Sequence, residues 1–264
     1  MPGEVIATTR LTSNMIRVVL GGDGLAGFEP TPHTDQYVNA LFIPDGAPYD
    51  GPFDVEAAKA GPSEHRPRGR RYTIRSWYPV ARQLTIDFVV HGDVGYAGRW
   101  ATRAQPGDRL QFLGPSGGYA PDPEADWYFM AGDESALPAI AASLERVRPG
   151  APAQVVVVVD GPDGELALDS PGDLTVHWVH RTHADGDVTR VVDAVAAIDF
   201  GPGRCDVFVH GEAAEIRAVR RHLVAACGID AAGASISPYW RRGETDEAWR
   251  QHKAAFVAAM NADA

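Results

Sequence analysis

Five consecutive valines at residues 155–159 constrain the fold of this chain more than any other stretch. An unbroken β-branched run is typical of a parallel strand that is covered on both faces. Similar strand-like segments lie at residues 127–131, 174–179 and 206–210, and helix-like segments separate most of them. This alternation predicts a doubly wound parallel sheet, whose ligand crevice lies at the carboxyl ends of its strands.

Helices in this half are placed by their flanking residues. Pro138 fits the first turn of a helix, where a missing N–H costs nothing, and Gly228 fits the C′ position that ends one. A last strand from Ile236 leads to a C-terminal helix with Thr245 as N-cap and Trp249 on its apolar stripe. The predicted helices run from near Ser135 to Pro149-Gly150, over residues 188–198, from about 213 to 227 and over 244–260.

The first half has a different pattern. Six short β-rich segments are separated by Gly, Pro, Asn and Asp, which predicts a six-stranded antiparallel barrel or a sandwich. They lie at residues 5–11, 15–20, 37–43, 71–77, 83–91 and 108–113. Residues 45–70, rich in Pro, Gly and charge, are expected to form a long surface excursion. Because the pattern changes after residue 119, we assign residues 1–122 to a β-barrel domain and 123–264 to an α/β domain.

Composition and charge exclude several classes of function. With 264 residues, 45% of them hydrophobic, the chain can bury the cores of two domains. Its net charge of −11 disfavours nucleic acid and anionic membranes as partners, because both need a positive field. No apolar run is long enough to span a bilayer and the N-terminus lacks the pattern of a signal peptide, so we expect a cytoplasmic protein and a monomer. Cys205 and Cys227 are too far apart for a CxxC pair and are expected to be reduced packing residues.

The segment RRYTIR in the first half carries a motif of the form R-x-Y-[ST], whose leading arginine is either Arg70 or Arg71. An aromatic ring, a hydroxyl and several guanidinium groups on one extended segment can serve a flavin. Tyr72 would stack on the isoalloxazine, Thr73 would reach its polar edge, and arginine would pair with pyrophosphate. An exposed barrel strand with solvated arginines, Arg75 among them, is the alternative.

Other polar groups stand where a ligand would be met. A short helix at residues 97–104 follows the glycines of HGDVG and would aim free N–H groups at an anion, although an ordinary strand-to-helix connection fits equally well. At the ends of two predicted parallel strands lie polar clusters that can either meet a nucleotide or cap a helix. They contain Asp133, Glu134 and Ser135 in the first cluster and His210 and Glu212 in the second. Neither cluster is a GxGxxG fingerprint, so a plain Rossmann dehydrogenase is not indicated.

Hydrolytic and metal chemistry find little support. His177, His180 and His183 recur every third residue, but residues three apart on a strand face opposite sides, so we predict no metal site. The chain shows no Cys/His pair and no HExxH motif. Such an absence is expected where a cofactor carries electron or hydride transfer. Positive charge gathers at Arg241, Arg242, Arg250 and Lys253, which points to an anionic ligand near the C-terminus.

Seven blocks occur in a fixed order along nearly the whole chain: RRYTIR, HGDVGYAGRWA, LGPSGGY, AGDESALPAI, WVHR, VHGEAAEIRAVRRHL and YWRRG. Together they resemble the siderophore-interacting protein family of FAD-dependent ferric-siderophore reductases, a branch of the ferredoxin–NADP⁺ reductase superfamily. The resemblance implies an FAD-binding barrel followed by an NAD(P)H-binding α/β domain. It implies hydride transfer from NAD(P)H to FAD and single-electron transfer to chelated Fe(III), which leaves Fe(II) less tightly held by hard oxygen ligands.

The resemblance also implies roles for individual residues. Arg70 or Arg71, with Tyr72, Thr73 and Arg75, would hold FAD, and His91, Gly95, Ala97 and Trp100 would line its ribityl and pyrophosphate. Asp133, Glu134 and Ser135 would lie beside the nicotinamide, and Tyr239 and Trp240 would flank the flavin. Arg181 would meet the adenosine ribose or its phosphate, which favours NADPH as donor over NADH. The ferric siderophore would dock on Arg241, Arg242, Arg250 and Lys253. A reductase of ferredoxin or free flavin, and a siderophore carrier without catalysis, are the alternatives.

Overall fold

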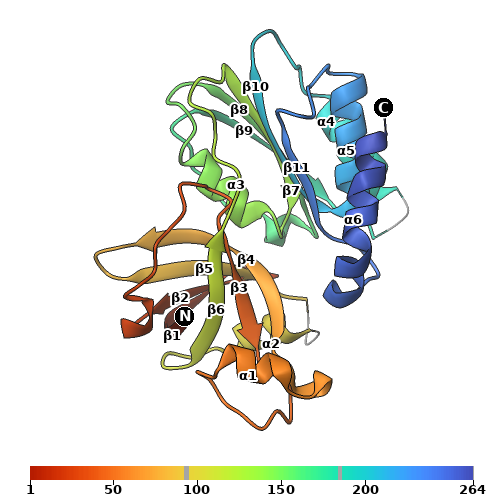
Figure 1. The fold of residues 1–264 in the computed structure, drawn as a ribbon. Helices are drawn as coiled ribbons and strands as arrows, with labels where there is room; N and C mark the ends of the chain where they lie inside the picture. The colour runs from red at the N-terminus through yellow and green to blue at the C-terminus, as the bar shows by residue number, and fades with distance from the viewer. Residues whose placement is uncertain (92–94, 184–185, 264) are drawn as a thin grey trace. The chain divides into compact units, whose positions relative to one another are not determined.

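The computed structural model describes residues 1–91, 95–183 and 186–263 of the chain (Figure 1). It divides into two compact units, Met1–Tyr119 and Ala120–Ala264. This division lies three residues before the predicted boundary at residue 122. Each unit has its own sheet, and the two are described separately.

The first unit is a closed antiparallel barrel with the strand order β1-β2-β5-β4-β3-β6 (Figure 1). Closure decides between the barrel and the sandwich that the sequence left open. The strands are β1 (Pro2–Thr12), β2 (Met15–Gly21), β3 (Tyr37–Phe42), β4 (Arg68–Tyr78), β5 (Gln83–Val89) and β6 (Arg109–Ser116). Alternate residues of each strand point inward, so that Val38, Ala40 and Phe42 of β3 join one apolar core. Strand β4 begins three residues earlier than predicted, because Arg68 pairs with Phe42 of β3.

Helix α2 (Tyr96–Arg103) covers one end of this core, one residue earlier than predicted. Its Ala97 and Ala101 are buried in the barrel core, and its Trp100 packs against Phe42 and Phe88 with ring centroids 6.0 and 5.6 Å apart. The excursion after β3 contains a short helix that the sequence analysis missed, α1 (Val55–Ala60). Asp54 caps α1 by accepting hydrogen bonds from the backbone N–H groups of Glu56 and Ala57.

The second unit is a five-stranded sheet with the order β11-β10-β7-β8-β9, and every strand pair is parallel. The strands are β7 (Trp127–Asp133), β8 (Pro152–Val159), β9 (Asp173–His180), β10 (Cys205–Glu212) and β11 (Ser235–Trp240). The chain lays down β7, β8 and β9 in one direction and then crosses back to place β10 on the other side of β7. Strand order therefore reverses between β7 and β10, which is where ligands bind in sheets of this kind.

Helix α3 lies on one face of this sheet, and α4 and α5 lie on the other (Figure 1). The predicted doubly wound sheet with a C-terminal helix is confirmed. The helices are α3 (Leu137–Leu144), α4 (Asp187–Ala196), α5 (Ala213–Ala225) and α6 (Asp246–Ala262). Thr245 is the N-cap of α6, as predicted, and accepts a hydrogen bond from the N–H of Ala248.

Three predicted helix boundaries, two of α3 and one of α5, were wrong. Helix α3 begins at Leu137, after the predicted start at Ser135, because the side chain of Asp133 binds the N–H and hydroxyl of Ser135 and holds them in a turn. It ends at Leu144, well before Pro149, where Arg146 already donates to the nearer carbonyl of Ser143. Helix α5 ends at Ala225, so Gly228, with φ of 70°, lies beyond the C′ position.

The two cysteines are free and half-buried, and both pack against the apolar cluster of the second unit. Burial raises the pKa of the Cys205 thiol to about 12, so this thiol stays protonated and unreactive at neutral pH. Within residues 1–91, 95–183 and 186–263, no helix has both the length and the apolar character needed to cross a bilayer.

Candidate functional site

The R-x-Y-[ST] motif lies on β4, and the register of β4 with β3 shows which way its side chains face. Arg70 and Tyr72 stand opposite Ala40 and Val38, whose side chains are in the barrel core. Residues directly opposite in an antiparallel pair share a face, so Arg70 and Tyr72 belong to one row. The ring of Tyr72 packs against Phe88, with centroids 4.4 Å apart. Arg71 and Thr73 occupy the opposite face.

The two candidate arginines consequently have different surroundings. The guanidinium of Arg70 lies over the ring of Tyr96, 5.8 Å from its centroid, and Tyr96 is the first residue of α2. The guanidinium of Arg71 lies 5.7 Å from the centroid of Tyr37 on β3. Of the two arginines, only Arg70 therefore lies on the same strand face as Tyr72 and also reaches the start of a helix. This geometry favours Arg70 as the leading arginine of the motif.

The start of α2 is suited to an anion. Its N-cap is Gly95, with φ of 79° and ψ of 170°, and this glycine has no side chain that could cap the first turn. A left-handed φ of this kind favours glycine, and a Cβ there would meet no atom within 4 Å. Uncapped N–H groups at a helix start, together with an arginine over the first residue, form the combination that binds phosphate groups. The residues present therefore fit the pyrophosphate of FAD.

The other residues predicted to bind this cofactor differ in how far they are exposed to solvent. Thr73 is buried, Arg75 is half-buried, and His91 is exposed beside residues 92–94, which lie outside the described part of the chain. The side chain of Ala97 points into the barrel core, so only its backbone can contact a ligand.

A pocket of about 270 Å³ lies on the barrel between α2, the end of β3, the start of β6 and the excursion that follows β3. Trp100 lines it, whereas Tyr72 and Thr73 do not. The excursion is held there by Gln111, whose amide makes two 2.9 Å hydrogen bonds with the backbone of Phe53. The pocket draws residues from five separated segments, Pro2 of β1 among them, and no local sequence signal could have found it.

At the carboxyl edge of the parallel sheet, Asp133 at the end of β7 is 1% exposed and binds four donors. Its Oδ1 accepts from the N–H and hydroxyl of Ser135 at 2.8 and 2.5 Å. Its Oδ2 accepts from Trp240 Nε1 at 2.7 Å and from the N–H of Glu212 at 2.9 Å. One carboxylate thus joins β7, β10 and β11, and occupies N–H groups that would otherwise be free for a ligand.

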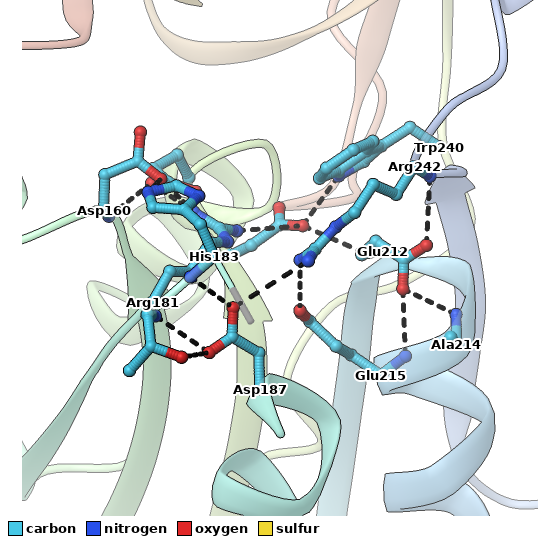
Figure 2. Close-up of polar contacts among 12 residues, drawn as sticks. Asp160, Arg181, His183, Asp187, Glu212, Ala214, Glu215, Trp240 and Arg242 are labelled. Atoms are coloured by element: carbon cyan, nitrogen blue, oxygen red, sulfur yellow. Dashed lines mark hydrogen bonds and ion pairs between the residues drawn. The ribbon is translucent and has the colours of Figure 1, made fainter. Parts of the chain in front are cut away.

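Arg181, directly after β9, forms a buried ion pair (Figure 2). Its side chain is 5% exposed, and its Nη1 lies 2.7 Å from both carboxylate oxygens of Glu134 and 3.1 Å from Asp160 Oδ1. Burial alone would lower the pKa of this guanidinium, but the carboxylates of Glu134, Asp133 and Glu215 raise it, so Arg181 stays charged. The predicted contact of Arg181 with a ribose phosphate is not what this geometry favours, because the charge already has partners within the chain.

Three further carboxylates and one more arginine complete this edge. Glu212 caps α5 by accepting from the N–H groups of Ala214 and Glu215, and Asp187 accepts from the N–H and hydroxyl of Thr182. Figure 2 shows Arg242 reaching between Glu215 and Asp187, with nitrogen–oxygen distances of 3.3 and 3.8 Å. We call the eight side chains of this edge the carboxylate network. It contains Asp133, Glu134, Asp160, Asp187, Glu212, Glu215, Arg181 and Arg242.

The basic residues near the C-terminus are largely paired. Besides Arg242, Arg241 lies 3.4 Å from Glu244 and Arg250 lies 2.7 Å from Asp246. Burial, and then the positive charge of Lys253, lower the pKa of the His210 imidazole to about 3. The three arginines therefore have acidic neighbours just before α6, on α6 and in the network, and docking of an anionic ligand on them stays a prediction. Trp240 binds Asp133, and the ring of Tyr239 lies 4.9 Å from that of His210.

The three histidines considered as metal ligands point to other partners. His177 and His180 bind Gln154 and Glu165, at 3.0 and 2.8 Å, and His183 lies 3.9 Å from Asp160. In the part of the chain that the structure describes, no three His, Cys, Asp or Glu side chains are placed to hold a metal ion together.

Comparison with known proteins identifies the chain. Residues 4–119 match the siderophore-interacting FAD-binding domain, and residues 125–243 match the siderophore-interacting protein model. Ferric vibriobactin reductase ViuB of Vibrio cholerae is 34% identical over 251 residues, which cover 92% of this chain and 90% of that protein. The chain belongs to the siderophore-interacting protein family. An uncharacterized protein of Mycobacterium tuberculosis is 41% identical over 269 residues, covering 97% of this chain and 95% of that one.

Siderophore-interacting proteins also share the fold. The crystal structure of SipS from Aeromonas hydrophila matches with a TM-score of 0.82 and 26% identity, over 98% of both chains. The resemblance drawn from the seven sequence blocks is thus confirmed, and the barrel is the FAD-binding domain of this family. What the blocks could not show is the carboxylate network, because its members meet only when the ends of five strands are brought to one edge.

We expect the buried carboxyl group of Glu215 to make the stability of the second unit depend on pH. Burial, and then Asp133 and Glu212, raise its pKa to about 7, although Arg181 and Arg242 oppose the shift. A carboxyl group with a raised pKa binds its proton more tightly in the folded state, so stability is full below the unfolded pKa and falls as pH rises toward 7. We expect Glu215→Gln to flatten this fall between about pH 4.5 and pH 7. Chemical denaturation of both proteins at several pH values measures it, and equal slopes would contradict the assignment.

Proposed function

We propose that this protein is a ferric-siderophore reductase that takes electrons from a nicotinamide dinucleotide through FAD and passes them singly to chelated Fe(III). The observation that carries the proposal is Arg70 beside the uncapped start of α2, on the barrel face that also holds Tyr72. A second support is that a relative covering most of the chain is named ferric vibriobactin reductase. When bound, FAD supplies the redox centre that no amino-acid side chain provides.

The barrel residues would bind and orient this cofactor. Arg70 and the N–H groups of α2 would hold its phosphates, with Gly95 giving the close approach. Tyr72, fixed by packing on Phe88, would present its ring to the isoalloxazine, and the hydroxyl of Thr73 would hydrogen-bond to the polar edge. A ring held by core packing loses little entropy when it stacks on a ligand.

The second unit would bind the electron donor at the carboxyl edge of its sheet, where strand order reverses. The ferric siderophore is the proposed substrate, and its iron stays in the chelate, so no side chain of the protein needs to bind the metal. Docking on Arg241, Arg242, Arg250 and Lys253 stays a proposal, and their acidic neighbours favour a chelate of low net charge.

The decisive experiment photoreduces the FAD-loaded protein without oxygen and adds ferric siderophores of several classes. Flavin absorbance should return while a chromogenic chelator reports one Fe(II) for each electron lost. Free FAD, photoreduced at the same concentration, is the control for reaction outside the protein. If none of the siderophores reoxidises the protein faster than free FAD, the protein is not a ferric-siderophore reductase, and a carrier that binds the chelate without reducing it becomes the better explanation.

A further inference from the structure

The end of β8 carries the group best placed to meet the adenosine ribose of a dinucleotide. In doubly wound sheets an acidic residue that follows the first nucleotide-binding turn bonds the ribose 2′-hydroxyl, whereas an arginine nearby accommodates a 2′-phosphate. Asp160 directly follows β8, the second strand of this unit, and its side chain is 39% exposed. Arg181 follows β9, the neighbouring strand. The chain therefore offers one residue of each type at this position.

Arg181 is poorly suited to receive a phosphate. Its Nη1 is bound to Glu134 and Asp160, and the side chain is 5% exposed. Its Nε and Nη2 have no hydrogen-bond partner among the described residues, but both atoms are buried, and Nη2 lies 3.9 Å from Asp133 Oδ2. A phosphate that reached these two donors would have to enter between carboxylates. Arg181 thus acts as the internal counter-charge of the network.

The surroundings add to this barrier. Six carboxylates of the network face two guanidinium groups, and the other guanidinium, that of Arg242, already lies between Glu215 and Asp187 (Figure 2). A polar side chain exposed beside Asp160 is His183, whose imidazole lies 3.9 Å from that carboxylate. A neutral ribose hydroxyl can donate a hydrogen bond to Asp160, whereas a 2′-phosphate brings close to two negative charges against it.

We propose that this edge selects a dinucleotide without a 2′-phosphate, so that NADH is the electron donor and Asp160 is the residue that determines this specificity. The inference rests on the proposed function, because a site for an electron donor is needed only if the protein is a reductase. It replaces the preference for NADPH that the sequence resemblance implied, because the arginine on which that preference depended is engaged within the chain.

The matched pair of variants is Asp160→Asn and Asp173→Asn. Asparagine at 160 removes the charge, keeps an acceptor for Arg181, and leaves the backbone N–H of residue 160 bonded to Glu134. Asp173 begins β9 at the opposite end of the sheet and is exposed, so its variant removes the same charge far from the ribose. Eight strand residues separate the two ends by about 23 Å, more than twice the screening length at physiological salt.

Kinetics of flavin reduction test the proposal in the FAD-loaded protein. The wild type should show kcat/KM for NADH at least about tenfold above that for NADPH, a ratio worth about 1.4 kcal/mol. Asp160→Asn should narrow the ratio about fivefold or more, mainly through a lower KM for NADPH, and Asp173→Asn should leave it unchanged. A wild type that prefers NADPH, or equal effects of the two variants, would overturn the proposal.

A binding measurement gives a readout that needs no flavin. Calorimetric titration with adenosine 5′-monophosphate and adenosine 2′,5′-bisphosphate compares ligands that differ only in the 2′-phosphate, and the wild type should bind the first more tightly. If neither NADH nor NADPH reduces the flavin, the donor assignment fails, while reaction of the photoreduced protein with ferric siderophores still decides the proposed function. If NADH reduces the flavin but no siderophore reoxidises it, the donor assignment stands and the proposed function fails.

Discussion

Replacing Arg70 with alanine is expected to weaken FAD binding by about 10- to 100-fold, because a hydrogen bond to a charged group contributes about 1.5–3 kcal/mol. Arg70 lies over the first residue of α2 and shares the face of Tyr72, so its charge is directed to the place where the phosphates would lie. Titrating the apoprotein with FAD and following the quenching of flavin fluorescence gives the dissociation constant.

The neighbouring residue provides the matched control. Arg71→Ala removes the same charge from the opposite face of β4, where the guanidinium lies over Tyr37, and it should change the dissociation constant less than about threefold. Riboflavin, which has no phosphate, should bind both variants as it binds the wild type. A larger loss in Arg71→Ala than in Arg70→Ala would show that Arg71, and not Arg70, holds the phosphates of FAD.

One part of this distinction is visible in the sequence. Side chains alternate along a strand, so Arg70 and Tyr72 must share a face once β4 is accepted as a strand. The sequence alone left the choice open because nothing in it showed which face meets the cofactor. The contact of Arg70 with Tyr96, 26 positions later in the chain, answers this, and it depends on how α2 closes the barrel.

The elements whose existence depends on local pattern were predicted well. The valine run became β8 with both faces covered, and the Thr245 cap became the start of α6, because burial and capping act within a few residues. The start of α3 was misplaced for an equally local reason. The side chain of Asp133 accepts hydrogen bonds from Ser135 that compete with helix formation at this residue. An aspartate two residues before a serine does not by itself show whether the serine will lie in a turn or in the helix.

The charges of the second unit were the hardest to predict. Arg250 has Asp246 four residues earlier, a helical spacing that the sequence shows openly. Arg181 and Glu134 are 47 positions apart, and Arg242 and Glu215 are 27 apart, so their pairing depends on which strand ends become neighbours. A count of arginines therefore does not show that acidic neighbours offset these charges, and for Arg181 the geometry favours a role as internal counter-charge over contact with a ligand.

Replacing Asp133 with alanine is expected to cost about 3–5 kcal/mol of stability, because buried donors left without acceptors cost about 1–3 kcal/mol each. The Nε1–H of Trp240 and the N–H groups of Glu212 and Ser135 would lose their acceptor. Relief of repulsion with Glu134 and Glu215 offsets a part of the loss. The calorimetric transition of the second unit should fall by about 10 °C, at about 2–4 °C for each kcal/mol.

The control for this prediction is Asp169→Ala, which removes an exposed carboxylate from a loop of the same unit and should shift the transition by less than about 2 °C. Asp133→Asn should fall between the two, since an asparagine keeps the shape and one acceptor but turns an NH₂ group toward donors. Retention of FAD by all three variants would show that the barrel is intact. If Asp133→Ala is the least stable of the three variants, the hydrogen bonds of Asp133 stabilise the contact of β7 with β10 and β11. A transition in Asp133→Ala as high as in Asp169→Ala would mean that the four hydrogen bonds contribute nothing net, and that Asp133 is free to serve a ligand instead.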